Sequence, residues 1–227
     1  MKKIPTLFEH ECENHKVVGI KPTVAPWYNC LILTEGNWLY MTLNELSSKA
    51  YYKNEYGIIL NMDCIEAMKL MPDECIDLTV TSPPYDNLRT YEGFYWNFEE
   101  TAKELYRITK KGGAIVWIVG DATVNGSETG TSFRQALYFK EIGFNLHDTM
   151  IWEKSTFSNP FPNRYHQVFE YMFILSKGKL KTFNGIHDRK NKHGGVKVKP
   201  TIREANGQLF ARSEKKVAEY GKRFNVW

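Results

Sequence analysis

Long apolar runs are missing from this 227-residue chain, and cysteine is scarce. No stretch is long and apolar enough for a membrane-spanning helix, so the sequence predicts none. The start is polar rather than the apolar core of a secretory signal, so we expect a cytoplasmic protein. The cysteines are scattered without a Cys-x-x-Cys pair, which favours reduced thiols over a disulfide framework. They are Cys12, Cys30, Cys64 and Cys75.

Metal-site spacing is also lacking. His10 and His15 flank Cys12, but this arrangement lacks the paired short loops of a structural zinc site. Ordinary surface or core positions explain these residues more simply. The sequence therefore predicts no metal centre.

Positive charge is concentrated at one end. From Lys177 to Trp227 there are 14 Lys and Arg against 4 Asp and Glu, whereas the preceding residues carry 16 against 22. A basic segment on a mildly acidic body is typical of nucleic-acid binding, although a solvated, partly disordered tail has the same composition. Within it, the sequence predicts an exposed, mobile segment over 179–199 and an amphipathic helix over 204–220.

Strand and helix signals alternate between residues 57 and 81. Residues 57–62 predict a short buried strand. Asp63 and Glu66 have the spacing of an N-terminal helix cap, and Pro72 ends the helix that they start. Residues 76–81 predict the next strand. This strand–helix–strand order is what a parallel sheet requires.

Further elements continue the α/β pattern downstream. Apolar residues at helical spacing, followed by two lysines and two glycines, predict a helix and its end. Buried strands and a second helix come after it. The predicted ranges are helices over 98–109 and 132–141, and strands over 114–119, 146–152 and 169–175.

Chemistry is expected where the strand over 76–81 ends in Ser82, Pro83, Pro84 and Tyr85. In an open α/β sheet, ligands bind just outside the carboxyl ends of the strands. The two prolines fix φ and remove two backbone donors, so carbonyl groups stay free to accept hydrogen bonds. Tyr85 offers a flat face for stacking on a nucleobase. A proline-stiffened loop with a packing tyrosine is the plain alternative.

The run from Val80 to Tyr85, Val-Thr-Ser-Pro-Pro-Tyr, resembles the catalytic motif of the DNA methyltransferases that modify exocyclic amino groups. The similarity continues through the acidic strand end at 61–64, the Trp-x-Lys at 152–154 and the Phe-Glu-Tyr-x-x-x-Leu-Ser-Lys-Gly run at 169–178. It implies an α/β, Rossmann-like fold. It also implies transfer of a methyl group from S-adenosylmethionine to cytosine N4 or adenine N6 of double-stranded DNA.

The same resemblance implies roles for particular residues. The catalytic residues would be Ser82, Pro83, Pro84 and Tyr85. The cofactor would be bound by Asp63, at its strand end, together with Cys64 and Thr81. The DNA contacts would come from Asn87, Arg89, Lys154 and Arg164, although Arg89 could equally be an ordinary surface arginine.

The chemistry that such a turn could perform follows from the amino group itself. An exocyclic amino nitrogen is a poor nucleophile because its lone pair is delocalised into the ring. If Ser82 Oγ and the Pro83 carbonyl accept its two N–H groups, they localise the lone pair and orient it. The base must first leave the duplex, and Tyr85 would stack against it. In the family, serine at this position is commoner in cytosine-N4 enzymes, so the resemblance favours cytosine N4.

The glycine-rich cofactor loop of that family, Phe-x-Gly-x-Gly, does not occur in this sequence. In the subgroup whose catalytic motif precedes its cofactor motif, the loop comes later, and its strand lies beside the catalytic strand. We therefore expect an incomplete fold in which the central cofactor strand is missing and the strand ending at Asp63 cannot join the sheet. A longer chain or a second polypeptide would supply that part.

Three segments are predicted: an N-terminal extension of unknown role over 1–55, a methyltransferase core over 56–178, and a basic DNA-contacting, target-recognition segment over 179–227.

Two other functions stay open. One is a catalytically incomplete nucleic-acid-binding protein, or half of a split methyltransferase. The other is methylation of RNA or of a protein glutamine. Cofactor binding separates catalysis from binding alone, and the basic segment favours nucleic acid over protein.

Overall fold

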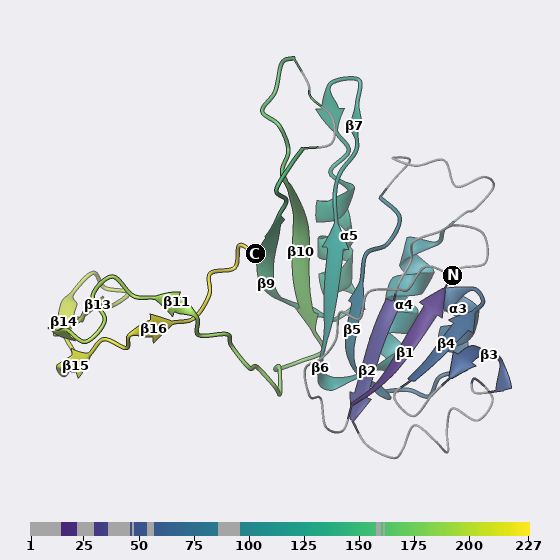
Figure 1. The fold of residues 1–227 in the computed structure, drawn as a ribbon, viewed down its shortest axis with the longest axis horizontal. Helices are drawn as coiled ribbons and strands as arrows, with labels where there is room; N and C mark the ends of the chain where they lie inside the picture. Colours follow the sequence, from purple (N-terminus) through teal and green to yellow (C-terminus); the bar gives the residue numbers. More distant parts are fainter. Residues whose placement is uncertain are drawn as a thin grey trace, which may run out of the picture. The chain divides into compact units, whose positions relative to one another are not determined.

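The computed structural model describes residues 15–21, 30–35, 46, 48–53, 57–85, 96–157, 160 and 162–227. The chain divides into two compact units, Met1–Thr182 and Phe183–Trp227 (Figure 1). Among the described residues, no helix is long and apolar enough to cross a membrane. The predicted functional boundaries after residues 55 and 178 stay predictions.

A mixed eight-stranded sheet organises the first unit, in the order β3-β4-β1-β2-β5-β6-β10-β9 (Figure 1). Its strands are β1 His15–Lys21, β2 Cys30–Glu35, β3 Ala50–Lys53, β4 Gly57–Asn61, β5 Ile76–Thr81, β6 Thr109–Val119, β9 Asn145–Glu153 and β10 Phe169–Ser176. The pairings make β4, β1, β5, β6 and β9 run in one direction, and β3, β2 and β10 in the other. The carboxyl ends of β4, β5, β6 and β9 therefore share one edge.

The predicted strands from residue 57 to 175 are confirmed, and β4 and β5 run parallel in one sheet as expected. One expectation is wrong, because the strand that ends before Asp63 does join the sheet. β1 pairs parallel with β4, β2 pairs antiparallel with β5, and β1 and β2 pair with each other. Residues 15–21 and 30–35 thus supply two interior strands that satisfy the facing backbone groups of β4 and β5.

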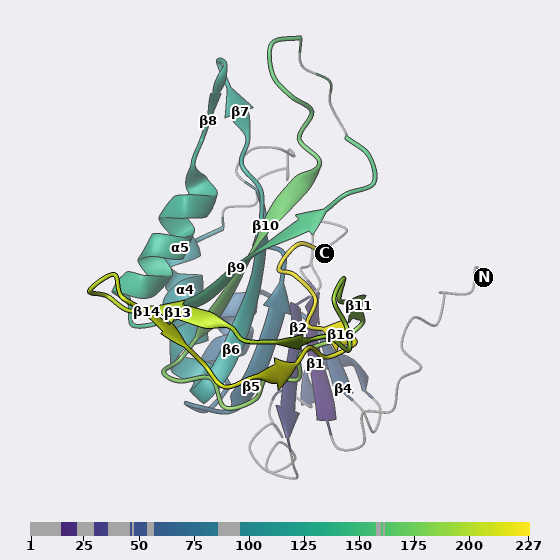
Figure 2. The ribbon, with the colours of Figure 1, turned by 90° about the vertical axis from the view of Figure 1, so that its left-hand side faces the viewer.

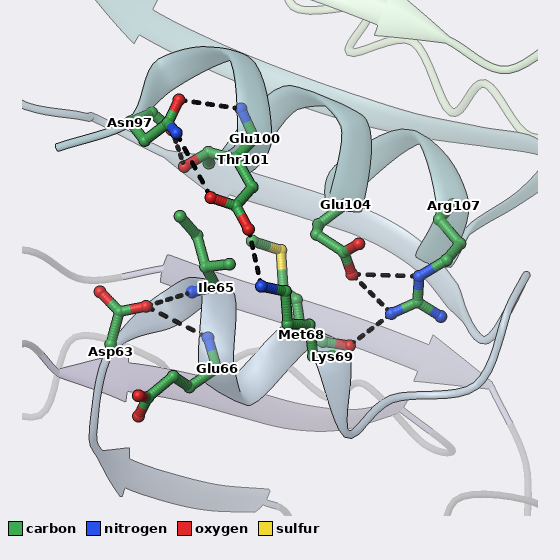
Figure 3. A network of polar contacts seen from close by, with 10 residues as sticks. All are labelled: Asp63, Ile65, Glu66, Met68, Lys69, Asn97, Glu100, Thr101, Glu104 and Arg107. Atoms are coloured by element: carbon green, nitrogen blue, oxygen red, sulfur yellow. Dashed lines mark hydrogen bonds and ion pairs between the residues drawn. The ribbon is translucent and has the colours of Figure 1, made fainter.

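The described residues between these strands include the helices α3 Cys64–Lys69, α4 Phe98–Ile108 and α5 Thr131–Glu141. Asp63 caps α3 as predicted, since its Oδ1 accepts from Ile65 N at 2.8 Å and from Glu66 N at 3.1 Å (Figure 3). The helix α4 contacts both α3 and α5, and Figure 2 shows α4 and α5 on the same side of the sheet.

Charged side chains fasten α3 to α4 (Figure 3). Lys69 Nζ donates to Glu100 Oε1 at 2.6 Å, and Arg107 Nη2 donates to the carbonyl oxygen of Met68 at 2.6 Å. Glu104 Oε2 holds the same guanidinium at 2.7 Å. The Met68 carbonyl also accepts from Met71 N at 2.9 Å, so the guanidinium adds a second hydrogen bond at the end of α3 and holds that end against α4.

An aromatic core lies between β6 and the helices. Trp117 on β6 and Phe139 on α5 are 1% and 0% exposed, and their ring centroids are 5.0 Å apart. Phe98 on α4 completes the cluster at 6.0 Å from Trp117. The indole Nε1 of Trp117 donates to Gln135 Oε1 at 2.9 Å, so its buried polar group is satisfied. This packing fixes β6, and with it the loop that follows β6 at the shared edge.

The second unit is one long two-stranded ribbon built of nested pairs (Figure 1). β11 Arg189–Lys190 pairs with β16 Tyr220–Gly221, β12 Lys197–Val198 with β15 Lys215–Lys216, and β13 Thr201–Arg203 with β14 Leu209–Ala211. The amphipathic helix predicted over 204–220 is therefore wrong. Gly207, at φ +86°, makes the tip turn, and backbone pairing with the first half of the ribbon replaces helical hydrogen bonds.

Candidate active site at the carboxyl edge of the sheet

The shared edge brings together residues that follow four different strands. Asp63 follows β4, Ser82 follows β5, Asp121 follows β6 and Lys154 follows β9. Glu170 joins them as the second residue of β10, which runs in the opposite direction. Ligands of open α/β sheets bind at this edge. The edge is therefore the candidate active site.

A chain of polar contacts starts at the Pro-Pro turn. Ser82 Oγ lies 2.7 Å from the Tyr85 hydroxyl, which donates to Glu170 Oε2 at 2.7 Å. Lys154 Nζ forms an ion pair with the other oxygen, Oε1, of Glu170. The Glu170 side chain is only 11% exposed and that of Lys154 34%, so this pair is screened less than a surface ion pair.

The Tyr85 ring packs directly on Gly120. A Cβ on Gly120 would lie 3.6 Å from ring carbons Cδ2 and Cε2 of Tyr85. The ring is thus fixed at its side by Gly120 and at its hydroxyl by Ser82 and Glu170. Stacking of Tyr85 on a base stays a prediction.

Glu170 is the site residue to which the sequence analysis assigned no role. Register explains its position: Tyr171 pairs with Val119, so Glu170 is level with Gly120 at the end of β6. A usable signal existed, because Glu170 is the one ionisable acid within the apolar run 169–176.

Asp63 keeps one oxygen for a ligand. Its Oδ1 caps α3, whereas Oδ2 has no hydrogen-bond partner among the residues that the structure describes (Figure 3). This oxygen could accept the hydroxyl or amino donors of a nucleoside, so the residue fits the predicted cofactor contact. With β1 and β2 in between, the ends of β4 and β5 lie three interstrand spacings, about 14 Å, apart.

The other two predicted cofactor residues lie next to these strand ends. Burial, and after it the charge of Asp63, raise the pKa of the Cys64 thiol to about 11, although a hydrogen bond with Thr101 acts to lower it. Cys64 is therefore a neutral thiol near pH 7, with no nucleophilic character. Thr81 is the last residue of β5 and pairs with Trp117 of β6. Their cofactor contacts stay predictions.

The predicted DNA contacts are placed only in part. Asn87 and Arg89 lie outside the described residues. Arg164 donates to the carbonyl oxygen of Gly126 and lies 3.7 Å from Glu128, and Lys154 is paired with Glu170. Both cations thus have partners within the chain, and their contact with DNA stays a prediction. In the described part of the chain, no cluster of His, Cys, Asp and Glu could hold a metal ion.

Asp121 joins the end of β6 to the start of α5. Its Oδ1 accepts from Ser132 N at 2.9 Å, and its Oδ2 accepts from Ser132 Oγ at 2.5 Å. The N-cap residue of α5 is Gly130, which has no side chain, so Asp121 supplies the cap from outside the helix. Its negative charge at the helix N-terminus also interacts favourably with the helix dipole.

Removing this cap should destabilise the first unit. Asp121→Ala leaves the amide and the fully buried hydroxyl of Ser132 without an acceptor, which we expect to lower the free energy of unfolding by about 2–4 kcal/mol. Asp121→Asn keeps one acceptor oxygen and should lose about half as much. Urea unfolding followed by circular dichroism measures both. An Asp121→Ala variant as stable as the wild type would contradict the capping role.

Known proteins resemble this chain over the part that contains the site. A family model described as DNA methylase, of the N6/N4 methyltransferases, matches residues 76–227. The orphan methyltransferase M.BamHII of Bacillus amyloliquefaciens is 61% identical over 158 residues, covering 68% of this chain and 60% of that protein. The type II methyltransferase M.ScaI of Streptomyces caespitosus is 32% identical over 110 residues, covering 46% and 36%.

Among solved structures, the cytosine-N4-specific PvuII DNA methyltransferase matches with a TM-score of 0.48 and 23% identity, over 58% of this chain and 53% of that one. A DNA modification methylase from Thermus thermophilus matches with a TM-score of 0.42 and 26% identity, over 54% and 53%. The chain spans well under two thirds of the length of these relatives. The family match covers the Pro-Pro-Tyr turn, β6, β10 and the basic ribbon. The chain belongs to the N6/N4 DNA methylase family.

Proposed function

We propose that this chain transfers a methyl group from S-adenosylmethionine to the exocyclic amino group of a base flipped out of double-stranded DNA. Cytosine N4 is favoured over adenine N6, because Ser82 stands at the first position of the Pro-Pro-Tyr turn. The observation that supports this most is the placement of Ser82 and Pro83 at the carboxyl end of β5, with the Ser82 hydroxyl held by Tyr85.

The residues of the turn bind and orient the amino group. Ser82 Oγ and the Pro83 carbonyl each accept one N–H, which localises the nitrogen lone pair and directs it. When bound, S-adenosylmethionine supplies an activated methyl group that is displaced from sulfur onto the nitrogen, which then gives up one proton to solvent. Tyr85, fixed by Gly120 and Glu170, holds the flipped base by stacking.

DNA affinity comes from the ribbon of the second unit in this proposal. Residues 183–227 carry 11 Lys and Arg against 4 Asp and Glu. Phosphate contacts from such a segment supply salt-dependent affinity and register, whereas base contacts choose the sequence. A two-stranded ribbon also has the dimensions to enter the major groove. Asn87, Arg89, Lys154 and Arg164 are the further DNA contacts that we propose.

Binding of S-adenosylmethionine, measured by isothermal titration calorimetry, tests the cofactor site. Asp63→Ser keeps a good helix cap but removes the carboxylate, so α3 stays formed while the cofactor loses a charged acceptor. We expect it to weaken binding about 10–100-fold. Asp63→Ala should lose the same affinity and about 1 kcal/mol of stability as well. An Asp63→Ser variant that binds as tightly as the wild type would rule out the cofactor contact.

A second function, DNA binding without catalysis, is favoured by one feature: the sequence contains no Phe-x-Gly-x-Gly loop. We propose that a further polypeptide segment or a partner supplies this loop beside β5. The calorimetric titration decides between the alternatives. Binding by the chain alone would make the added loop unnecessary, and binding only after a loop-bearing segment is added would support it. No binding in either case would leave DNA binding as the function.

A further inference from the structure

We propose that Glu170, paired with Lys154, fixes the direction of the hydrogen bonds at Ser82, so that Ser82 Oγ faces the substrate only as an acceptor. The inference rests on the proposed function and deepens it, because it makes Glu170 and Lys154 positioning residues for the methyl transfer. Their contacts form one continuous chain from Lys154 through Glu170 and Tyr85 to Ser82.

Proton counting gives the direction of each contact. An ionised carboxylate can only accept hydrogen bonds, and a phenol has a single proton to donate. Glu170 Oε1 forms an ion pair with the Lys154 ammonium, and Glu170 Oε2 accepts from Tyr85, so Glu170 is the acceptor in both contacts. Tyr85 therefore donates its one hydroxyl proton to Glu170 Oε2, 2.7 Å away. The 2.7 Å contact between Tyr85 and Ser82 then needs the Ser82 proton, so Ser82 is the donor in it.

This direction suits an amino-group substrate. Once the Ser82 proton points at Tyr85, the remaining lone-pair direction of Ser82 Oγ is free to accept an N–H. With the opposite direction, Tyr85 would donate to Ser82, and the Ser82 proton could point at the amino nitrogen. A hydrogen bond to that nitrogen would withdraw the lone pair that must attack the methyl group.

The position of Glu170 is held by its neighbours. Its side chain is 11% exposed and lies on β10, between β6 and β9. The backbone of Lys154 donates to the carbonyl oxygen of Val168 at 2.6 Å, which extends the pairing of β9 with β10 up to the ion pair. Each oxygen of Glu170 thus has its own donor: Lys154 on Oε1 and Tyr85 on Oε2.

Glu170→Gln reverses the direction without changing the size of the side chain. The Lys154 ammonium attracts the amide oxygen, which turns the NH₂ group toward Tyr85. Tyr85 must then donate to Ser82 instead. We expect kcat to fall about 10–100-fold while KM for DNA changes little, because the fold and the DNA contacts are kept. The assay follows tritiated methyl transfer from S-adenosylmethionine to unmethylated genomic DNA.

The double variant Lys154→Met/Glu170→Gln is the decisive one. Without the ammonium, the amide oxygen of Gln can face Tyr85 again, so we expect kcat to recover to within about fivefold of the wild type. Loss of the proposed DNA contact of Lys154 would raise KM and leave this recovery of kcat visible at saturating DNA. A purely structural role of Lys154 predicts the opposite, a further loss of kcat. A Glu170→Gln variant with wild-type kcat, or a double variant slower than Glu170→Gln, would overturn the proposal.

A measurement independent of activity separates this proposal from the proposed function. A neutron structure of the deuterated, DNA-free chain locates the hydroxyl deuterons. We expect the deuteron of Ser82 to point at Tyr85 and that of Tyr85 to point at Glu170. A Tyr85 deuteron directed at Ser82 would overturn the inference. A wild-type protein that transfers no methyl group, either alone or with a loop-bearing segment added, would instead overturn the proposed function, whatever the deuteron positions.

Discussion

Ser82→Ala should lower kcat for methyl transfer about 10²–10³-fold, the cost of losing one positioned hydrogen-bonding group that stabilises a transition state. The change removes the Ser82 hydroxyl, so one amino N–H of the base loses its proposed acceptor. Affinity for DNA should stay near that of the wild type, since phosphate contacts dominate it. Single-turnover kinetics with enzyme in excess measures the chemical step directly.

A matched control separates chemistry from folding in this experiment. Ser127→Ala makes the same substitution on the exposed hairpin β7 Thr123–Val124 and β8 Ser127–Glu128, where the hydroxyl donates to the Glu128 carbonyl. We expect it to leave the single-turnover rate unchanged. If Ser82→Ala kept more than half of the wild-type rate, Ser82 would not be the acceptor for the amino group.

Phe139→Ala should destabilise the first unit by about 3–5 kcal/mol, the typical cost of removing a buried aromatic side chain. Phe139 is 0% exposed and packs edge-on against three rings, at 5.0 Å from Trp117, 5.5 Å from Phe98 and 5.7 Å from Phe144. The cavity would lie between β6 and two helices, where several side chains would lose contacts together. Urea unfolding measured by tryptophan fluorescence and circular dichroism gives the change in the free energy of unfolding.

Leu137→Ala is the control for this prediction. Leu137 lies two residues away on the same helix α5 but is 57% exposed. Its replacement should cost less than about 1 kcal/mol, the range of ordinary surface substitutions. Equal losses from the two variants would mean that the aromatic cluster is not the stabilising core of this unit.

Local signals were enough to predict the elements around the site. The cap at Asp63 and the strand at 76–81 rest on residues within one turn or one strand, so the sequence analysis found both. The Pro-Pro-Tyr turn could also be placed at the carboxyl end of its strand. These features depend only on residues that are close together in the chain, so a single sequence is enough to predict them.

Contacts between distant segments could not be predicted in the same way. Tyr85 and Glu170 lie 85 positions apart, and they meet because β10 pairs with β6 in one particular register. The insertion of β1 and β2 beside β5 has the same nonlocal origin, although the apolar runs 17–20 and 31–33 are typical of strands. Over 204–220, helical spacing was outweighed by backbone pairing across the ribbon.

Methyl transfer to an exocyclic amino nitrogen is tested most directly by identifying the modified nucleoside. DNA incubated with the protein and isotope-labelled S-adenosylmethionine is digested to nucleosides and analysed by mass spectrometry. We expect labelled N4-methyl-deoxycytidine, formed about 10²–10³-fold more slowly when the Ser82→Ala variant is used. Labelled N6-methyl-deoxyadenosine would keep the chemistry and change the target base. Label on carbon 5 of cytosine, or an N4-methyl product undiminished by Ser82→Ala, would contradict catalysis by the Ser82 turn.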